Sequence, residues 1–190
     1  MTAGPDGGQR VTETVYEAAG GSNGLLQLAA AWHERVLADE VVSHAFSHGY
    51  HPEHTERLAA YWAEALGGPR TYSTSYGDES AVVRMHSGNG LHEEMDRRAI
   101  DCFDQALEDV GVGDERLRRV LHEYFAWTTT TTMARYHHCE HDVPDGLRIP
   151  QWSWAGLVNA TDSGDGAGPH ESRVGPPSPE GREPAPARRR

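Results

Sequence analysis

The residues of this chain with the clearest capacity for chemistry are its histidines, of which there are twelve among 190 residues. His86 stands out because it ends the apolar run in "VVRMHSGNGL", residues 82–91, and precedes a loop of small, turn-forming residues. A buried imidazole needs a partner for each ring nitrogen, and this loop has no bulk to cover one. His86 is therefore either an incidental surface residue or a ligand for something that docks at the end of its helix.

Other histidines offer competing interpretations. His54 lies one turn before Leu58 on the apolar face of a helical pattern, although a solvent-facing position is a serious alternative. His33 is either a pocket residue or a satisfied core histidine. The run "HHCEH", residues 137–141, contains ligand types that zinc or copper accepts. Adjacent histidines do not easily ligate together from a helix, so a surface cluster is favoured there.

The composition excludes several classes of protein. The formal net charge of −12 argues against non-specific binding to nucleic acid, which depends on a basic surface. Two cysteines, Cys102 and Cys139, form neither a disulfide framework nor a four-cysteine zinc site. No apolar run is long enough to span a bilayer, and the N-terminus lacks a signal-peptide core. These features predict a cytoplasmic protein that binds neither nucleic acid nor membrane.

The chain divides into three parts. Residues 1–12 are polar and glycine-rich, which predicts a flexible N-terminus. Residues 13–158 alternate helical patterns with glycine and are expected to form one domain. Residues 159–190 contain almost no apolar side chains and balance five acids against five arginines, which predicts a disordered tail with no net charge.

Four segments of the central part have helical periodicity, and none of these alternates like a strand. They are residues 22–37, 51–68, 91–111 and 114–138. Asp114 is the expected N-cap of the last one, where five consecutive threonines need tertiary packing to stay helical. Cys102 falls on an apolar face as a small buried hydrophobic residue. The pattern predicts an all-α protein.

A long irregular segment, residues 67–90, separates the second and third helices and contains one short helix over residues 79–86. Loops of this length inside a domain are usually functional. Helices around a pocket, with histidines on two of them, can hold a flat iron cofactor. Haem requires one neutral imidazole as axial ligand, an open second face and apolar walls.

At this point the residues resemble a known family. "YEAAGG" (16–21), "ERL" (56–58) and above all "GGPRTYS" (67–73), followed by a short helix ending in histidine, are similar to the truncated haemoglobins of the second group. The resemblance extends from Tyr16 to about Val110. It implies a two-over-two helical sandwich around haem b, with His86 as the proximal iron ligand.

The resemblance also implies a set of pocket residues. Phe46 falls where the family places an aromatic ring against the haem, His54 at the distal gate, and Leu58 beside the ligand. His33 replaces the usual distal tyrosine, and Ala99 replaces a pocket tryptophan. The room left by that indole is either an open cavity or is filled by another side chain, for which Trp152 and Trp154 are candidates.

Contacts to the haem propionates must come from unusual positions, because Met85 stands where a basic residue commonly precedes the proximal histidine. Arg84, Arg70 and Tyr72 are the candidates. The segment "VPDGLRIPQWSWAGLV", residues 143–158, resembles nothing in the family and is expected to be an added piece. Its two tryptophans alternate as in an extended segment and are expected to clasp the helical core.

The sequence therefore favours a haem protein that binds dioxygen and other diatomics, with oxidoreductase activity toward peroxide or nitric oxide and an unidentified electron donor. Two distal histidines suit peroxide chemistry, because an imidazole that titrates near neutrality can both accept and return a proton. A non-catalytic oxygen carrier or gas-sensing module is the alternative, and a globin-like interaction protein without haem is a third. The sequence also leaves open whether the protein forms a homodimer.

Overall fold

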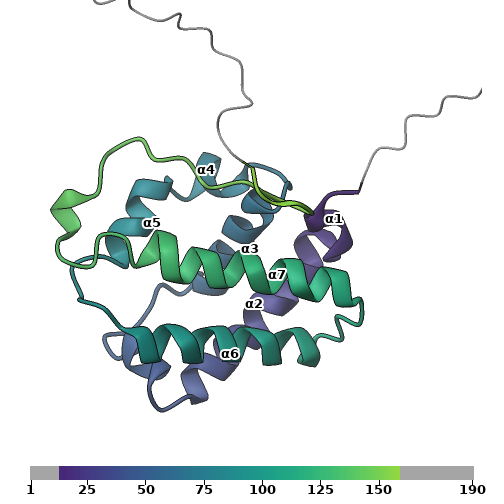
Figure 1. The fold of residues 1–190 in the computed structure, drawn as a ribbon, viewed down its shortest axis with the longest axis horizontal. Coiled ribbons are helices and arrows are strands. Elements are labelled where there is room, and N and C mark those ends of the chain that lie inside the picture. Colours follow the sequence, from purple (N-terminus) through teal and green to yellow (C-terminus); the bar gives the residue numbers. More distant parts are fainter. Residues whose placement is uncertain (1–12, 159–190) are drawn as a thin grey trace, which may run out of the picture. The chain divides into compact units, whose positions relative to one another are not determined.

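A computed structural model describes residues 13–158 of the chain (Figure 1). The predictions for residues 1–12 and 159–190 fall outside this range. The elements that carry most of the domain are α1 (Val15–Ala18), α2 (Gly21–Ala38), α3 (His54–Ala65), α4 (Thr71–Ser75), α5 (Glu79–Met85), α6 (Glu93–Asp109) and α7 (Glu115–Trp127). Short 3₁₀ helices η1 (Val42–Phe46) and η3 (Glu140–Asp142), a π-helix η2 (Thr128–Met133) and strands β1 (Trp152–Ser153) and β2 (Gly156–Leu157) complete it.

The long helices pack against each other around one aromatic core. Helix α2 contacts both α3 and α6, while α6 and α7 lie side by side and run in opposite directions (Figure 1). The rings of Phe103 and Phe125 stack at a centroid separation of 4.2 Å, and Trp62 meets both edge-on. These contacts bury the apolar faces that the helical periodicity predicted. The all-α prediction is confirmed.

Side-chain caps fix where several helices begin. Asp114 accepts a hydrogen bond from the backbone N–H of Leu117 at 2.7 Å, so the predicted N-cap of α7 is present. Asp78 caps α5 in the same way through the N–H of Ala81. Because each cap satisfies a backbone donor that lacks a partner inside its helix, these two aspartates set the first turns of α7 and α5.

The predicted C-terminal end of the last helix, residue 138, is wrong. The α-helix stops at Trp127, residues 128–133 form a π-helix, and the chain then leaves helical conformation before residue 138. The Thr130 hydroxyl donates to the carbonyl of Ala126 at 2.8 Å, a side-chain bond that competes with the regular backbone pattern. The threonine run therefore widens the last turns of the helix and ends it early.

The added segment turns back along α5 and ends in a small antiparallel hairpin near α1 (Figure 1). Trp152 pairs with Leu157 across the hairpin, and its ring packs against Tyr124 and Trp127. The indole N–H of Trp154 donates to the carbonyl of Glu13 at 2.7 Å. The tryptophans thus clasp the helices as predicted, through two strands that the helical patterns did not include.

Within residues 13–158, no helix is long and apolar enough to cross a membrane.

Candidate functional site

His86 caps the C-terminal end of α5, and its side chain is exposed. Its Nδ1 atom donates a hydrogen bond of 2.8 Å to the backbone carbonyl of Val82, one turn earlier. Because Nδ1 carries the proton in this bond, the lone pair of Nε2 is left pointing away from the helix. A histidine that ligates a metal commonly has this arrangement, with the non-ligating nitrogen fixed by a carbonyl or carboxylate.

Two large apolar side chains close to His86 in the sequence are exposed. Met85 is 69% exposed and Leu91 is 60% exposed, on either side of the His86 loop. Exposed apolar side chains on both sides of a free imidazole nitrogen are compatible with an apolar ligand at this position. A flat, mostly apolar group with a metal at its centre would use both features.

The glycines after His86 explain why the loop is so small. Gly88 and Gly90 adopt φ values of 75° and 82°, which other residues rarely reach. Their N–H groups donate to the carbonyls of Tyr136 at 3.1 Å and His137 at 2.9 Å. Residues 136–137, which follow η2, therefore fix the backbone of the loop through these two hydrogen bonds. The sequence did not suggest this role for them.

Four rings gather on the other side of the candidate site. His33 from α2 lies 4.8 Å from His54 of α3, 5.4 Å from Phe46 of η1 and 4.6 Å from Tyr50, all measured between ring centroids. The structure thus brings together the three residues that the resemblance placed in the distal pocket, His33, His54 and Phe46. Tyr50 is an additional member that sequence reasoning missed.

The two histidines of this ring cluster have nitrogen atoms without partners. His33 Nε2 and His54 Nδ1 are buried and have no hydrogen-bond partner within residues 13–158. The other nitrogen of His33, Nδ1, lies 3.1 Å from the hydroxyl of Thr55. Buried polar atoms are normally paired, so unsatisfied atoms at this position indicate a site for a polar ligand. Thr55 fixes the His33 ring so that Nε2 is the free nitrogen.

The electrostatics keep both imidazoles neutral. Burial lowers the pKa of His33, and burial together with repulsion from His33, His86 and His51 lowers the pKa of His54 to about 4. The pKa of His54 is lower than the near-neutral value expected from its residue type. At pH 7 its imidazole is therefore a neutral donor and acceptor.

The backbone of Ala99 contacts a tryptophan that was not among the candidates. The indole N–H of Trp32 donates to the carbonyl of Ala99 at 3.1 Å, and its ring packs on Trp62 and Phe125. Trp152 and Trp154, the candidates for the room left at Ala99, contact other residues: Trp152 packs on Tyr124 and Trp127, and Trp154 lies under the guanidinium of Arg116. Leu58 is half-buried on α3 and packs against the core.

The candidates for anionic contacts are engaged in other interactions. Arg84 donates to the carbonyl of Val143 at 3.2 Å and pairs with Asp145 of the added segment. Arg70 is mostly exposed, and its Nε lies 3.6 Å from a carboxylate oxygen of Glu64. Tyr72 is buried against two other tyrosines.

The histidine cluster after η2 lacks the geometry of a metal centre. The rings of His137 and His138 lie 3.9 Å apart, and Cys139 Sγ lies 3.6 Å from His141 Nδ1. Among the described residues, no three histidine, cysteine or acidic side chains are placed to hold a metal ion. This supports the interpretation of "HHCEH" as a surface cluster.

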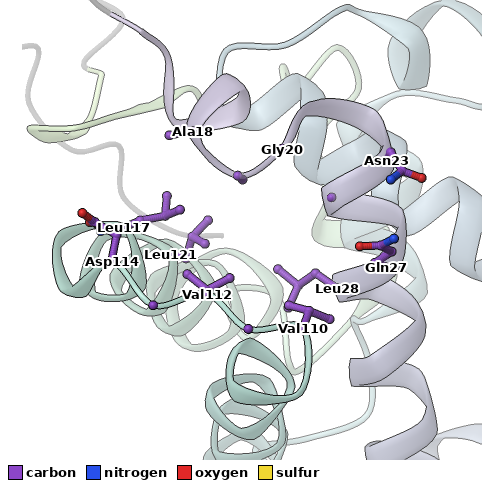
Figure 2. Close-up of a pocket in the computed structure, with 14 residues that line it drawn as sticks. Ala18, Gly20, Asn23, Gln27, Leu28, Val110, Val112, Asp114, Leu117 and Leu121 are labelled. Carbon is purple, nitrogen blue, oxygen red and sulfur yellow. Dashed lines mark hydrogen bonds between the residues drawn. The ribbon is translucent and has the colours of Figure 1, made fainter.

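A cavity of about 410 Å³ lies away from these histidines, between the start of α2 and the turn that joins α6 to α7 (Figure 2). Leu28, Val112 and Leu121 form its apolar floor. Its one ionisable lining residue, Asp114, already caps α7. This cavity therefore has no free ionisable side chain to act on a ligand.

Comparison with known proteins identifies this arrangement. Residues 14–132 match the family model described as bacterial-like globin. The chain belongs to the bacterial-like globin family. Globins carry a haem iron and bind small gas ligands such as dioxygen, so haem is the cofactor of this chain too.

Individual relatives agree with this membership. A group 1 truncated haemoglobin of Tetrahymena pyriformis is 28% identical over 102 residues, which is 54% of this chain and 80% of that protein. The haemoglobin of Chloroflexus aurantiacus has a TM-score of 0.56 at 27% identity and covers 64% of this chain and 98% of its own. A group II truncated haemoglobin of Bacillus anthracis shares the fold at 23% identity and a TM-score of 0.56, over 63% of this chain and 89% of its own.

Proposed function

We propose that this globin holds haem b through Nε2 of His86 and binds dioxygen and other diatomics on the side of His33 and His54. The single observation that carries this proposal is the hydrogen bond from His86 Nδ1 to the Val82 carbonyl, which leaves Nε2 free. The exposed side chains of Met85 and Leu91 supply the apolar surface that the macrocycle would cover. "GGPRTYS" supports assignment to the second group of truncated haemoglobins.

The distal residues have separate tasks in this proposal. Thr55 holds His33, and His33 Nε2 is then available as a hydrogen-bond partner for a bound ligand. Phe46 and Tyr50 flank both histidines and cover part of their rings. A donor held in a water-poor site stabilises a polarised ligand more strongly than the same donor in water.

The proposal extends to oxidoreductase activity with hydrogen peroxide or nitric oxide as substrate. When bound, haem iron supplies the redox chemistry. His54 is neutral at pH 7 and can take a proton from peroxide and return it to the leaving oxygen. Its pKa of about 4 makes it a weaker base than a histidine near neutrality, so a slow peroxidase is expected.

Gas sensing is a second candidate, favoured by the contacts between the proximal helix and the added segment. The hydroxyl of Ser80 in α5 accepts from the N–H of Leu147 at 3.0 Å, and Arg84 of the same helix contacts Val143 and Asp145. A shift of α5 on ligand binding would therefore be transmitted to residues 143–147.

Absorption spectroscopy on the purified protein tests the proposal. Reconstitution with haem should give a Soret band that shifts on addition of carbon monoxide to the ferrous form. Consumption of peroxide or nitric oxide faster than by free haem would support the enzyme, and stable dioxygen binding without turnover would support the carrier or sensor. A protein that takes up no haem would contradict the enzyme, the carrier and the sensor alike.

A further inference from the structure

One buried carboxyl group has no role in the haem site described above. Glu79, the first residue of α5, is 2% exposed, and its Oε2 accepts a hydrogen bond of 2.8 Å from the hydroxyl of Tyr61. Tyr61 is itself only 4% exposed. The second oxygen, Oε1, is buried without a hydrogen-bond partner within residues 13–158. An apolar pair would fill this space at lower cost, because burying a carboxyl group is unfavourable.

The Tyr61 ring begins a line of phenols that leads outward. Tyr61 and Tyr72 meet edge-on at a centroid separation of 5.3 Å, and Tyr72 and Tyr76 lie 5.9 Å apart. Tyr76 is half-buried, with the guanidinium of Arg57 over its ring at 5.2 Å. Three oxidisable rings thus connect the buried carboxyl group to the surface.

The inner end of this line, Tyr61, lies on the same helix as the distal histidine. Tyr61 follows His54 by seven residues and Leu58 by three on α3, spacings that place all three on one face of the helix. Tyr61 is therefore the oxidisable side chain on the face that presents the distal histidine.

We propose that Tyr61 is a redox-active residue, that Glu79 is its proton acceptor, and that Tyr76 is the point at which an external electron donor is oxidised. This inference rests on the proposed reaction with hydrogen peroxide, which is the oxidant. Tyr61 gives one electron to the peroxide-oxidised haem protein and its hydroxyl proton to Glu79 Oε2, which leaves a neutral phenoxyl radical.

The remaining steps return the pair to its starting state. Tyr76 gives an electron to Tyr61 through Tyr72 and releases its own proton to water, while the proton on Glu79 returns to Tyr61. A small hydrogen-atom donor of the phenol class then reduces the Tyr76 radical at the surface. Two donors are oxidised for each peroxide, which becomes two water molecules.

The protonation behaviour of Glu79 is compatible with this role. Burial raises the pKa of Glu79 to about 7, against a partial opposing effect of the Tyr61 hydrogen bond. The carboxyl group therefore exists in both protonation states near neutral pH. A proton acceptor works best when its pKa lies near the operating pH.

Tyr124 provides a matched comparison. It is also buried, with 2% exposure, but within the described residues no carboxyl group accepts a hydrogen bond from its hydroxyl. A phenol without a proton acceptor is much harder to oxidise to the neutral radical. Tyr124→Phe is therefore the control for Tyr61→Phe.

The test mixes the haem-loaded protein with hydrogen peroxide, freezes the sample and records the tyrosyl radical by electron paramagnetic resonance, with the Soret band followed in parallel. Tyr61→Phe should lower the radical yield at least about tenfold, and Tyr124→Phe should leave it unchanged. Glu79→Gln should also lower the yield, because its amide cannot take the proton. Tyr76→Phe, a change near the surface, should change the shape of the signal and lower oxidation of phenolic donors.

The outcomes separate the two proposals. A normal Soret response to peroxide in Tyr61→Phe, with a radical yield equal to the wild type, would overturn the role of Tyr61 and leave the haem function standing. An unchanged radical signal in Tyr76→Phe would remove the outward route even if Tyr61→Phe does not fold. A wild-type protein without any Soret response to peroxide would overturn both.

Discussion

The hydroxyl of Thr55 lies 3.1 Å from Nδ1 of His33, and this contact decides which nitrogen of His33 faces the candidate ligand site. Thr55→Val removes the contact with little change in volume, whereas Thr55→Ser keeps it. Because one neutral hydrogen bond contributes about 1 kcal/mol, Thr55→Val should raise the dioxygen dissociation rate about fivefold. Stopped-flow measurement of both variants checks this, and equal rates in the valine and serine variants would show that Thr55 does not orient His33.

The two distal histidines should have separable effects. His54→Ala should speed ligand exchange, remove any bis-histidine ferric signal and lower peroxide turnover about 100-fold, a typical loss for one acid-base group. His33→Phe should mainly raise the dioxygen dissociation rate. If imidazole ligation survives the loss of His54 and disappears with His33, the two roles are reversed. If neither change alters the kinetics, both histidines lie outside the ligand site.

Glu79 should make the stability of the folded protein depend on pH. Its pKa is about 7 in the fold, against 4.5 for an ordinary carboxyl group, because burial disfavours the charged form. Between these values the folded state binds more protons than the unfolded state, so stability falls as the pH rises and becomes level above about pH 8. The loss between pH 5 and pH 8 should be about 2 kcal/mol.

Urea unfolding at several pH values measures this loss, with Glu79→Gln as the control. The glutamine keeps an oxygen that accepts from Tyr61 but has no charge to bury. The unfolding free energy of this variant should therefore not show the decrease between pH 5 and pH 8 that Glu79 causes in the wild type. A wild type and variant with parallel pH profiles would mean that Glu79 is already ionised in the fold at pH 5.

The hairpin should contribute measurably to stability through Trp152. Trp152→Ala removes a buried indole from Tyr124 and Trp127 and should cost about 3 kcal/mol. Trp154→Ala, which loses a hydrogen bond to Glu13 and the contact with Arg116, should cost about 1 kcal/mol. Removal of residues 159–190 should leave the melting temperature unchanged. Equal losses in both tryptophan variants would show that the hairpin is not anchored by Trp152.

Much of the fold followed from local patterns in the sequence. The apolar periodicity predicted α2, α3, α6 and α7, and the residue type at position 114 predicted the cap of α7. The end of α7 did not follow, because the outcome at the threonines depends on a competition between side-chain and backbone hydrogen bonds. The alternation of Trp152 and Trp154 predicted an extended segment, but the pairing of two such short strands into a hairpin left no signal in the sequence.

The candidate site likewise contains residues that the sequence predicted and contacts that it did not. "GGPRTYS" and the helix that ends at His86 pointed to the proximal histidine, and the structure brings His33, His54 and Phe46 together as the resemblance implied. Contacts that join distant segments had no local signal. The hydrogen bond of Tyr61 to Glu79 and that of Trp32 to Ala99 depend on helix packing, which residue types alone do not determine.

Haem binding by a His86→Gly variant, compared with His92→Gly as a control on the exposed start of α6, tests the central claim most directly. His86→Gly should bind haem weakly, and free imidazole should restore a ferrous spectrum with an axial nitrogen ligand. His92→Gly should resemble the wild type. A five-coordinate ferrous spectrum in His86→Gly that matches the wild type without added imidazole would contradict the assignment of His86 as the iron ligand.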